Sequence, residues 1–188
     1  MEDIRVINDR TRRAYDLAGP RYHELFRDEM KEKEYDRLLL DRFAGGLGRG
    51  ASVLDAGCGP SAHIGRYIFD KGFEVTGLDI SGVCVAIARG CNPGMEIVQG
   101  DIGEMPFAAG AFDAVVSYYS IIDTPRAYMG RLFGEFRRVL RPGGRLLVAV
   151  KAGGTEGYMP DLLGTGAEVY FTLFSQEEIE GYFNDHGF

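Results

Sequence analysis

The chain has 188 residues, 45% of them hydrophobic, and its formal net charge is −7 at pH 7. This length and apolar content predict one globular domain with a sizeable core. The acidic balance argues against nucleic acid as a partner, because phosphate binding depends on Lys and Arg. The sequence has no run of about 18 apolar residues that could span a membrane.

Cysteine usage and the start of the chain bear on the cellular compartment. Cys58, Cys84 and Cys91 are odd in number and lack the paired spacing of a metal site. The first residues contain no apolar segment long enough for a secretory signal. We therefore expect a cytoplasmic protein with reduced cysteines and no metal.

Residues 1–45 are predicted to form a helical lid, separate from a core made by residues 46–188. Apolar residues recur at helical spacing over residues 22–43, which predicts an amphipathic helix. A shorter helix is expected over residues 7–17, with a break at Gly19-Pro20 between the two. Because an apolar stripe must be buried, we expect the lid to cover the ligand edge of the core.

From residue 52 onward, short apolar runs alternate with helical patterns. Continuous apolar runs indicate strands buried on both faces of a parallel sheet, and connections of helix length imply right-handed crossovers. The sequence therefore predicts an α/β fold with a doubly wound, mostly parallel, Rossmann-like sheet. Strands are expected at 52–56, 74–79, 95–99, 114–119 and 145–151, and helices at 61–71, 81–89, 127–140 and 175–184.

The first strand runs into a glycine turn, Asp55-Ala-Gly-Cys-Gly59, followed by a helix pattern. Glycine lets the backbone bend sharply and a ligand approach the main chain. Asp79 ends the next strand, 20 residues after Gly59 (79 − 59), where an acidic side chain accepts hydrogen bonds from both hydroxyls of a ribose. Asp55 would repel a pyrophosphate, but it suits a ligand that carries an ammonium or sulfonium group.

Five motifs in order resemble those of the class I S-adenosylmethionine-dependent methyltransferases, in particular those acting on small molecules. The resemblance covers most of residues 46–188, and Ser61 stands where a third glycine is common; a serine is small and can cap the helix that follows. The motifs are Val53-Leu-Asp-Ala-Gly-Cys-Gly-Pro-Ser61, Gly77-Leu-Asp-Ile-Ser81, Gln99-Gly-Asp-Ile-Gly-Glu-Met-Pro-Phe107, Phe112-Asp-Ala-Val-Val-Ser-Tyr118 and Leu140-Arg-Pro-Gly-Gly-Arg-Leu-Leu147.

The resemblance implies S-adenosylmethionine as the cofactor and assigns residues to its nucleoside. Asp79 would bind the ribose, and Ile80 would present an apolar face to the adenine. Asp101 would accept a hydrogen bond from the adenine amine, and the N–H of Ile102 would meet a ring nitrogen. A strand-end cap at Asp79 and a turn aspartate at Asp101 are the structural alternatives.

The methionine part of the cofactor is assigned to the glycine turn. Main-chain groups of Ala56, Gly57, Cys58 and Gly59 would contact it. Asp55 would hold its amino group, directly or through water.

Two tyrosines are further candidates. Tyr118 follows the fourth strand, where relatives pass closest to the sulfonium, and an aromatic face there would favour the positive charge; a core tyrosine is the alternative. Tyr22, with Tyr15 seven residues before it, resembles the tyrosines of a lid helix in the family. The same spacing also suits packing on a helix face.

No catalytic residue is assigned, because methyl transfer requires mainly alignment and the exclusion of water. Some acceptors would need a base, for which His23, Asp123 and His186 are candidates. His63 is expected near the ligand corner without an assigned role.

The end of the chain differs from the usual pattern of the family. Ser175 begins a capped helix, and the chain ends at Phe188, whereas family members usually continue into two more strands. We expect either a truncated chain or replacement of these strands by a partner, for instance in a homodimer, because an open strand edge favours association. The glycine-rich residues 153–171 are predicted to form a substrate-binding wall or mobile cover.

These patterns predict methyl transfer from S-adenosylmethionine to an unidentified small-molecule acceptor. Two alternatives stay open. One is a non-catalytic S-adenosylmethionine-binding or scaffold protein with the same fold. The other is an NAD-dependent oxidoreductase, which Asp55 and the five ordered motifs disfavour.

Overall fold

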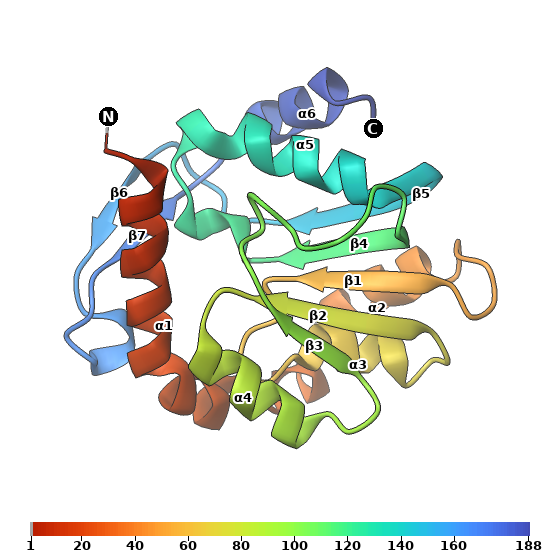
Figure 1. The fold of residues 1–188 in the computed structure, drawn as a ribbon, viewed down its shortest axis with the longest axis horizontal. Helices are drawn as coiled ribbons and strands as arrows, with labels where there is room; N and C mark the ends of the chain where they lie inside the picture. Colours follow the sequence, from red (N-terminus) through yellow and green to blue (C-terminus); the bar gives the residue numbers. More distant parts are fainter. Residues whose placement is uncertain (1) are drawn as a thin grey trace.

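The computed structural model describes residues 2–188, and its centre is a parallel sheet of five strands in the order β3-β2-β1-β4-β5 (Figure 1). Because β2 and β4 lie on opposite sides of β1, the chain changes direction there, and a crevice forms at the carboxyl ends of these strands. The predicted doubly wound parallel fold is confirmed. The strands are β1 (Ser52–Ala56), β2 (Glu74–Asp79), β3 (Glu96–Gln99), β4 (Phe112–Tyr118) and β5 (Leu140–Ala149).

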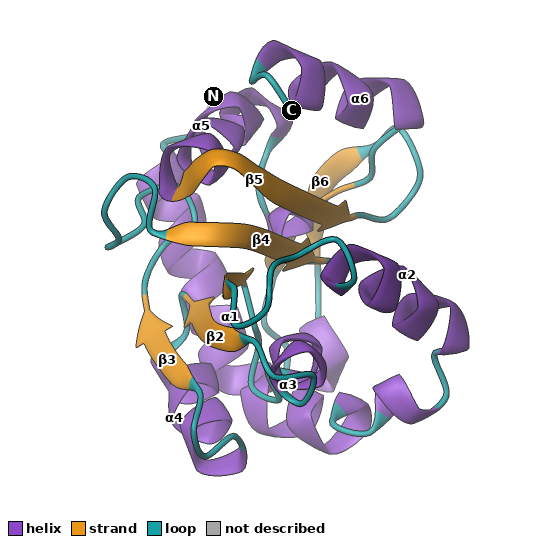
Figure 2. Cartoon of the chain, turned by 90° about the vertical axis from the view of Figure 1, so that its right-hand side faces the viewer, coloured by secondary structure: helices purple, strands orange, loops and turns teal. Residues whose placement is uncertain are grey.

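Helices cover both faces of the sheet (Figures 1 and 2). Side chains alternate along a strand, so Val53 joins the core cluster that includes Ile68, whereas its neighbour Leu54 joins the cluster of Phe133 and Phe136. The first cluster is closed by α2 (Glu34–Ala44), α3 (His63–Phe69) and α4 (Gly82–Cys91), and the second by α5 (Met129–Val139) and α6 (Gln176–Asp185).

The expected break at Gly19-Pro20 is wrong, because α1 is one helix of 23 residues, Ile4–Phe26, that runs through both residues. A Cβ on Gly19 would lie 3.1 Å from Cys84 Sγ of α4, so the missing side chain allows the two helices to pack closely. This packing offsets the backbone hydrogen bond that Pro20 cannot make. The break falls after Phe26 instead, where a short 3₁₀ turn, Glu29–Lys31, leads into α2.

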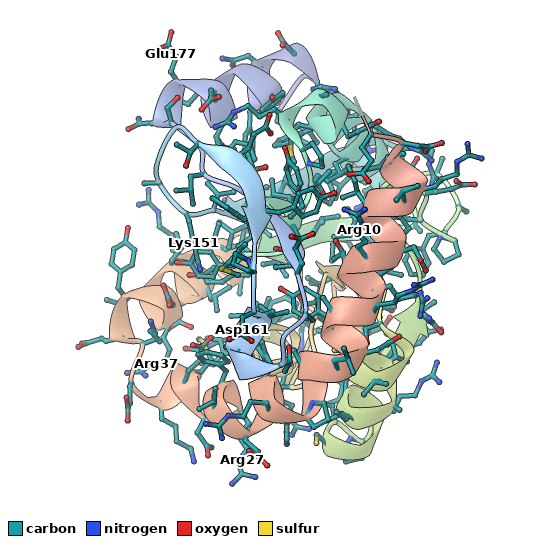
Figure 3. All side chains as sticks on the ribbon, turned by 90° about the vertical axis from the view of Figure 1, so that its left-hand side faces the viewer. Arg10, Arg27, Arg37, Lys151, Asp161 and Glu177 are labelled. Carbon is teal, nitrogen blue, oxygen red and sulfur yellow. The ribbon has the colours of Figure 1, made fainter. Side chains whose placement is uncertain are left out.

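The glycine-rich stretch 153–171 contains an antiparallel hairpin of β6 (Glu156–Met159) and β7 (Val169–Thr172). Figure 3 shows this hairpin beside α1. Val169 packs in a small apolar cluster with Ala14 and Ala18 of α1, and the Arg10 guanidinium lies over the Tyr158 ring, 5.2 Å from its centroid. The hairpin therefore supports α1 from outside.

The sheet ends differ slightly from the predicted ranges. β5 begins at Leu140, because Leu140 already pairs with Phe112. The pairing register then shifts, and the turn at Gly143 lies in this irregular part of the strand. Gly143 has φ +77°, a conformation that favours glycine. Among the described residues β5 is the edge strand on that side of the sheet.

The predicted cap of the last helix is present, with Ser175 and Glu178 forming a capping box.

Candidate functional site

A pocket is lined by residues at the carboxyl ends of β1, β2, β3 and β4 and by residues of α1; Figure 1 shows α1 beside these strand ends. The space among its lining residues is about 1140 Å³, part of it open to solvent. Every residue predicted to bind the cofactor lines it, except Ala56. Ala56 is fully buried at the end of β1, and its carbonyl accepts a hydrogen bond from Ser120 Oγ at 2.6 Å.

The glycine turn uses its first N–H groups internally. The N–H groups of Gly57 and Cys58 both donate to the carbonyl of Leu78, at 2.7 and 2.9 Å. Gly59 has φ +64°, and no atom lies within 4 Å of the position of a Cβ there. Because these two N–H groups are occupied, carbonyl oxygens are the polar groups that the turn offers to a ligand. Carbonyl oxygens suit a cationic ligand group better than a phosphate.

Asp55 stabilises the start of α3 and also lines the pocket. Its Oδ2 accepts a hydrogen bond from the N–H of Gly65 at 2.8 Å, and burial raises the pKa of this carboxyl to about 7. Ser61 does not cap the helix, contrary to expectation: the N-cap is Ala62, in a left-handed conformation. Ser61 Oγ lies 3.0 Å from His23 Nδ1 instead, so Asp55 takes over part of the capping role.

Asp79 joins the glycine turn to the end of β2. Its Oδ2 accepts from the N–H of Gly59 and its Oδ1 from the N–H of Ser81, both at 2.9 Å. Burial raises the pKa of this carboxyl to about 6. Each carboxylate oxygen has a second lone pair, which leaves acceptor capacity for a hydroxyl pair.

Asp101 has the geometry of a turn aspartate and a second partner that the sequence did not indicate. Its Oδ1 accepts from the N–H of Gly103 at 2.7 Å, and its Oδ2 accepts from Asn8 Nδ2 at 2.5 Å. The neighbouring Ile102 also lines the pocket. The turn and α1 together hold the carboxylate.

Sequence reasoning missed most of the α1 residues that line the pocket. Tyr15 and Tyr22 were predicted, whereas Ile4, Asn8 and Thr11 were not. The three missed residues recur at helical spacing, which is the signal that could have found them. Thr11 is only 8% exposed, and its Oγ1 has no hydrogen-bond partner. A buried polar atom without a partner is unusual.

Two further polar pairs line the pocket. Tyr15 Oη donates to Asp123 Oδ2 at 2.8 Å, and burial raises the pKa of Asp123 to about 7. His63 Nε2 lies 2.8 Å from Glu29 Oε1. These residues line the pocket, whereas His23 and His186 do not; His186 contacts backbone carbonyls near the C-terminus.

Four side-chain hydrogen bonds, which we call the lid ties, connect residues 1–45 to the strand ends. The Asn8–Asp101 and Tyr15–Asp123 bonds reach the turns after β3 and β4. Ser81 Oγ donates to Asp16 Oδ1 at 2.6 Å, and Tyr118 Oη to Asp36 Oδ1 at 2.7 Å. Tyr118 thus faces both the pocket and α2.

Two kinds of site are absent from the described part of the chain. Residues 2–188 contain no group of three or more His, Cys, Asp and Glu side chains placed to hold a metal. None of their helices is both long enough and apolar enough to cross a membrane.

Comparison with known proteins identifies relatives of this arrangement. A family model described as a methyltransferase domain matches residues 54–148. A malonyl-[acyl-carrier protein] O-methyltransferase of Enterobacter lignolyticus is 38% identical over 135 residues, covering 71% of this chain and 50% of that protein. A demethylmenaquinone methyltransferase of Beutenbergia cavernae is 33% identical, covering 72% and 58%.

The fold is also found among solved structures. The structure described as a DhpI–SAH complex superposes with a TM-score of 0.78 at 19% identity, covering 96% of this chain and 87% of that one. This likeness supports the fold. The chain spans about half the length of the curated relatives it matches.

Proposed function

Because the chain belongs to the class I S-adenosylmethionine-dependent methyltransferases, we propose that it transfers a methyl group from S-adenosylmethionine to a small-molecule acceptor. The observation that carries the proposal is the meeting of Asp55, Asp79 and Asp101 around one pocket, each at a strand end. We also propose that residues 1–45 act as a lid on a core of residues 46–188.

The lining of the pocket fits this cofactor. Asp79 would bind the ribose hydroxyls, and Ile80 and Ile102 would contact the adenine. The carboxylate of Asp101 would accept a hydrogen bond from the adenine amine. The open space at Gly59 leaves room beside the turn, where the carbonyls and Asp55 would receive the ammonium group. When bound, S-adenosylmethionine supplies a methyl group on a sulfonium that is already activated for transfer.

The chain itself would contribute alignment and the exclusion of water. α1 lies over the pocket, and Tyr15 and Tyr22 line it from above. Tyr118 would face the sulfonium with an aromatic ring, an arrangement that attracts a positive charge. Asp123 is positioned to accept a proton from an acceptor that must lose one.

Location and assembly are proposed on separate grounds. Cys58, Cys84 and Cys91 are free, which supports a reducing, cytoplasmic location. A homodimer would use the edge of β5, which pairs on one side only among the described residues. Analytical ultracentrifugation tests the dimer.

Calorimetric titration with S-adenosylhomocysteine and with NAD tests the cofactor, and a panel of phenols, amines, acids and thiols with labelled donor tests the reaction. We expect binding of S-adenosylhomocysteine and label in a small molecule. Binding of NAD alone would favour the oxidoreductase. Tight binding of S-adenosylhomocysteine without transfer to any acceptor would favour the scaffold protein.

A further inference from the structure

Two carboxylates in the pocket are not needed for the cofactor as assigned above. Asp123, at the turn after β4, is paired with Tyr15, and Glu29, after α1, is paired with His63. Both line the same pocket as Tyr22, and burial, followed by the charges of Glu29 and Asp123, raises the pKa of Tyr22. We call these five residues the acceptor half of the pocket.

Few positive charges are present to balance these carboxylates. Arg131 is the one arginine or lysine among the described lining residues, and its guanidinium already donates to the carbonyl of Gly103 at 2.6 Å and to Glu104 at 3.0 Å. Lys151, labelled in Figure 3, is near enough to lower the pKa of Asp123, but it does not line the pocket. The His63 contact holds the pKa of Glu29 below its ordinary value.

Aromatic rings complete the surroundings. Tyr15 and Tyr22 have ring centroids 6.4 Å apart, and Tyr118 and Tyr119 have centroids 5.1 Å apart. All four line the pocket, as does Tyr128. Aromatic faces attract cations, most strongly where water is excluded, so the rings and the carboxylates favour the same sign of charge.

An unpartnered group indicates that this space is built for a ligand. Thr11 lies one helical turn before Tyr15 on the pocket face of α1, and its buried hydroxyl has no partner. Leaving a buried hydroxyl unpaired costs free energy that a bound polar ligand would recover. The acidic cluster, the rings and this hydroxyl are independent features of one cavity.

We propose that the methyl acceptor is a small amine, whose nitrogen lies between Asp123, Glu29 and the tyrosine rings of the acceptor half. The amine would bind as an ammonium and give one proton to Asp123. The freed lone pair would form the N–C bond as the S–C bond of the donor breaks, so that S-adenosylhomocysteine leaves as a neutral thioether. The proposal rests on the methyltransferase function and specifies its substrate class. Asp55, Asp79 and Asp101 are assigned to the cofactor's ammonium group, ribose and adenine amine, which leaves Asp123 and Glu29 for the acceptor. An acceptor with a carboxylate or phosphate beside its reacting atom would be repelled by both.

Amines and acids of the same skeleton test the proposal: benzylamine against benzoate, and tyramine against 4-hydroxyphenylacetate. Binding is measured by ligand-observed NMR titration, with and without saturating S-adenosylhomocysteine, and methylated products are measured by mass spectrometry with S-adenosylmethionine. We expect each amine to bind at least about ten times more tightly than its acid. In the methylated product we expect the new methyl group on nitrogen. Equal or tighter binding of the acids, or no binding of either amine, overturns the proposal.

Variants locate the effect. Asp123→Asn keeps the size of the side chain and an oxygen for Tyr15, and should reduce the amine preference about tenfold. Asp185→Asn removes an exposed carboxylate from the end of α6 and should leave the preference unchanged. An unchanged preference in the Asp123 variant, folded by circular dichroism, contradicts the proposal. Methylation of acids alone would refute the amine proposal but not the proposed methyltransferase function. Failure to bind S-adenosylhomocysteine would refute the methyltransferase function itself.

Discussion

At the scale of single residues, Asp79 carries the most specific assignment. Asp79→Ala should weaken binding of S-adenosylhomocysteine by about 1.5–3 kcal/mol, the range for hydrogen bonds to a charged group. Asp101→Ala should cost less, because main-chain contacts to the adenine would remain. Calorimetry gives both affinities. An unchanged affinity in the Asp79 variant, with the fold intact by circular dichroism, would assign the nucleoside to another site.

Thr11 provides a stability prediction. Thr11→Val removes a buried hydroxyl without a partner, so the free energy of unfolding of the ligand-free protein should rise by about 1–3 kcal/mol in urea. Thr172→Val is the control, because Thr172 is also buried but its hydroxyl donates to the carbonyl of Thr124 at 2.8 Å. The control should lose stability. A loss in both variants would mean that Thr11 finds a partner in solution.

The raised pKa of Asp123 predicts how stability depends on pH. Its pKa in the folded protein, about 7, lies above the ordinary 3.8, so folding favours the protonated form. This contribution is complete below about pH 4 and is lost as the pH rises towards 7. In the Asp123→Asn variant, the free energy of unfolding should therefore fall less between pH 4 and 7 than in the parent protein, by an amount on the order of a few kcal/mol. Urea unfolding at several pH values measures it, with Asp185→Asn as the control; an unchanged slope would contradict the burial argument.

The sequence could identify residues within motifs but not their distant partners. Asp55, Gly57 and Asp79 follow from local spacing and strand order. Asn8 and Thr11 belong to no motif, and the contact of Asn8 with Asp101 joins positions 93 apart. Such contacts depend on how α1 is placed, which local patterns do not determine.

At the scale of elements, the error at Gly19-Pro20 shows packing prevailing over local propensity. Gly and Pro disfavour a helix interior in isolation. Here Ala18 and Gly19 are buried against other elements, and the small surface they give allows α1 to approach α4 closely. A sequence reading that weighs only local signals cannot include this contribution.

Gly19→Leu should loosen this packing. The Cβ of the added side chain would lie 3.1 Å from Cys84 Sγ. Overpacking of this kind lowers the free energy of unfolding by about 1–3 kcal/mol. We expect faster proteolysis between α1 and α2 and weaker binding of S-adenosylhomocysteine. Gly90→Leu on α4, where no atom lies within 4 Å of the Cβ position, is the control. Equal effects of the two substitutions would argue against a specific α1–α4 contact.

At the scale of the whole molecule, the parallel sheet was predictable because continuous apolar runs and helix-length connections leave few topologies. The hairpin of β6 and β7 was not predicted. Its strands are only four residues long each, and they are held by α1 rather than by an apolar pattern of their own.

Ligand binding should be visible in global stability. A ligand that binds only the folded state adds about 2.7 kcal/mol at 100 times its Kd. S-adenosylhomocysteine at that concentration should raise the free energy of unfolding of the whole chain by this amount, and by less for Asp79→Ala at the same concentration. Thermal unfolding with and without ligand measures the shift. No shift in the parent protein would contradict binding to the native state.

The lid ties link the opening of the pocket to its occupant over time. α1 and α2 cannot move away from the sheet without breaking bonds at Asp101, Asp123, Ser81 and Tyr118 together. If residues 1–45 act as the proposed lid, a molecule beneath them would leave as these bonds open. Substituting any one tie should therefore shorten the residence time of the product and raise the hydrogen-exchange rate of the α1 amides by similar factors.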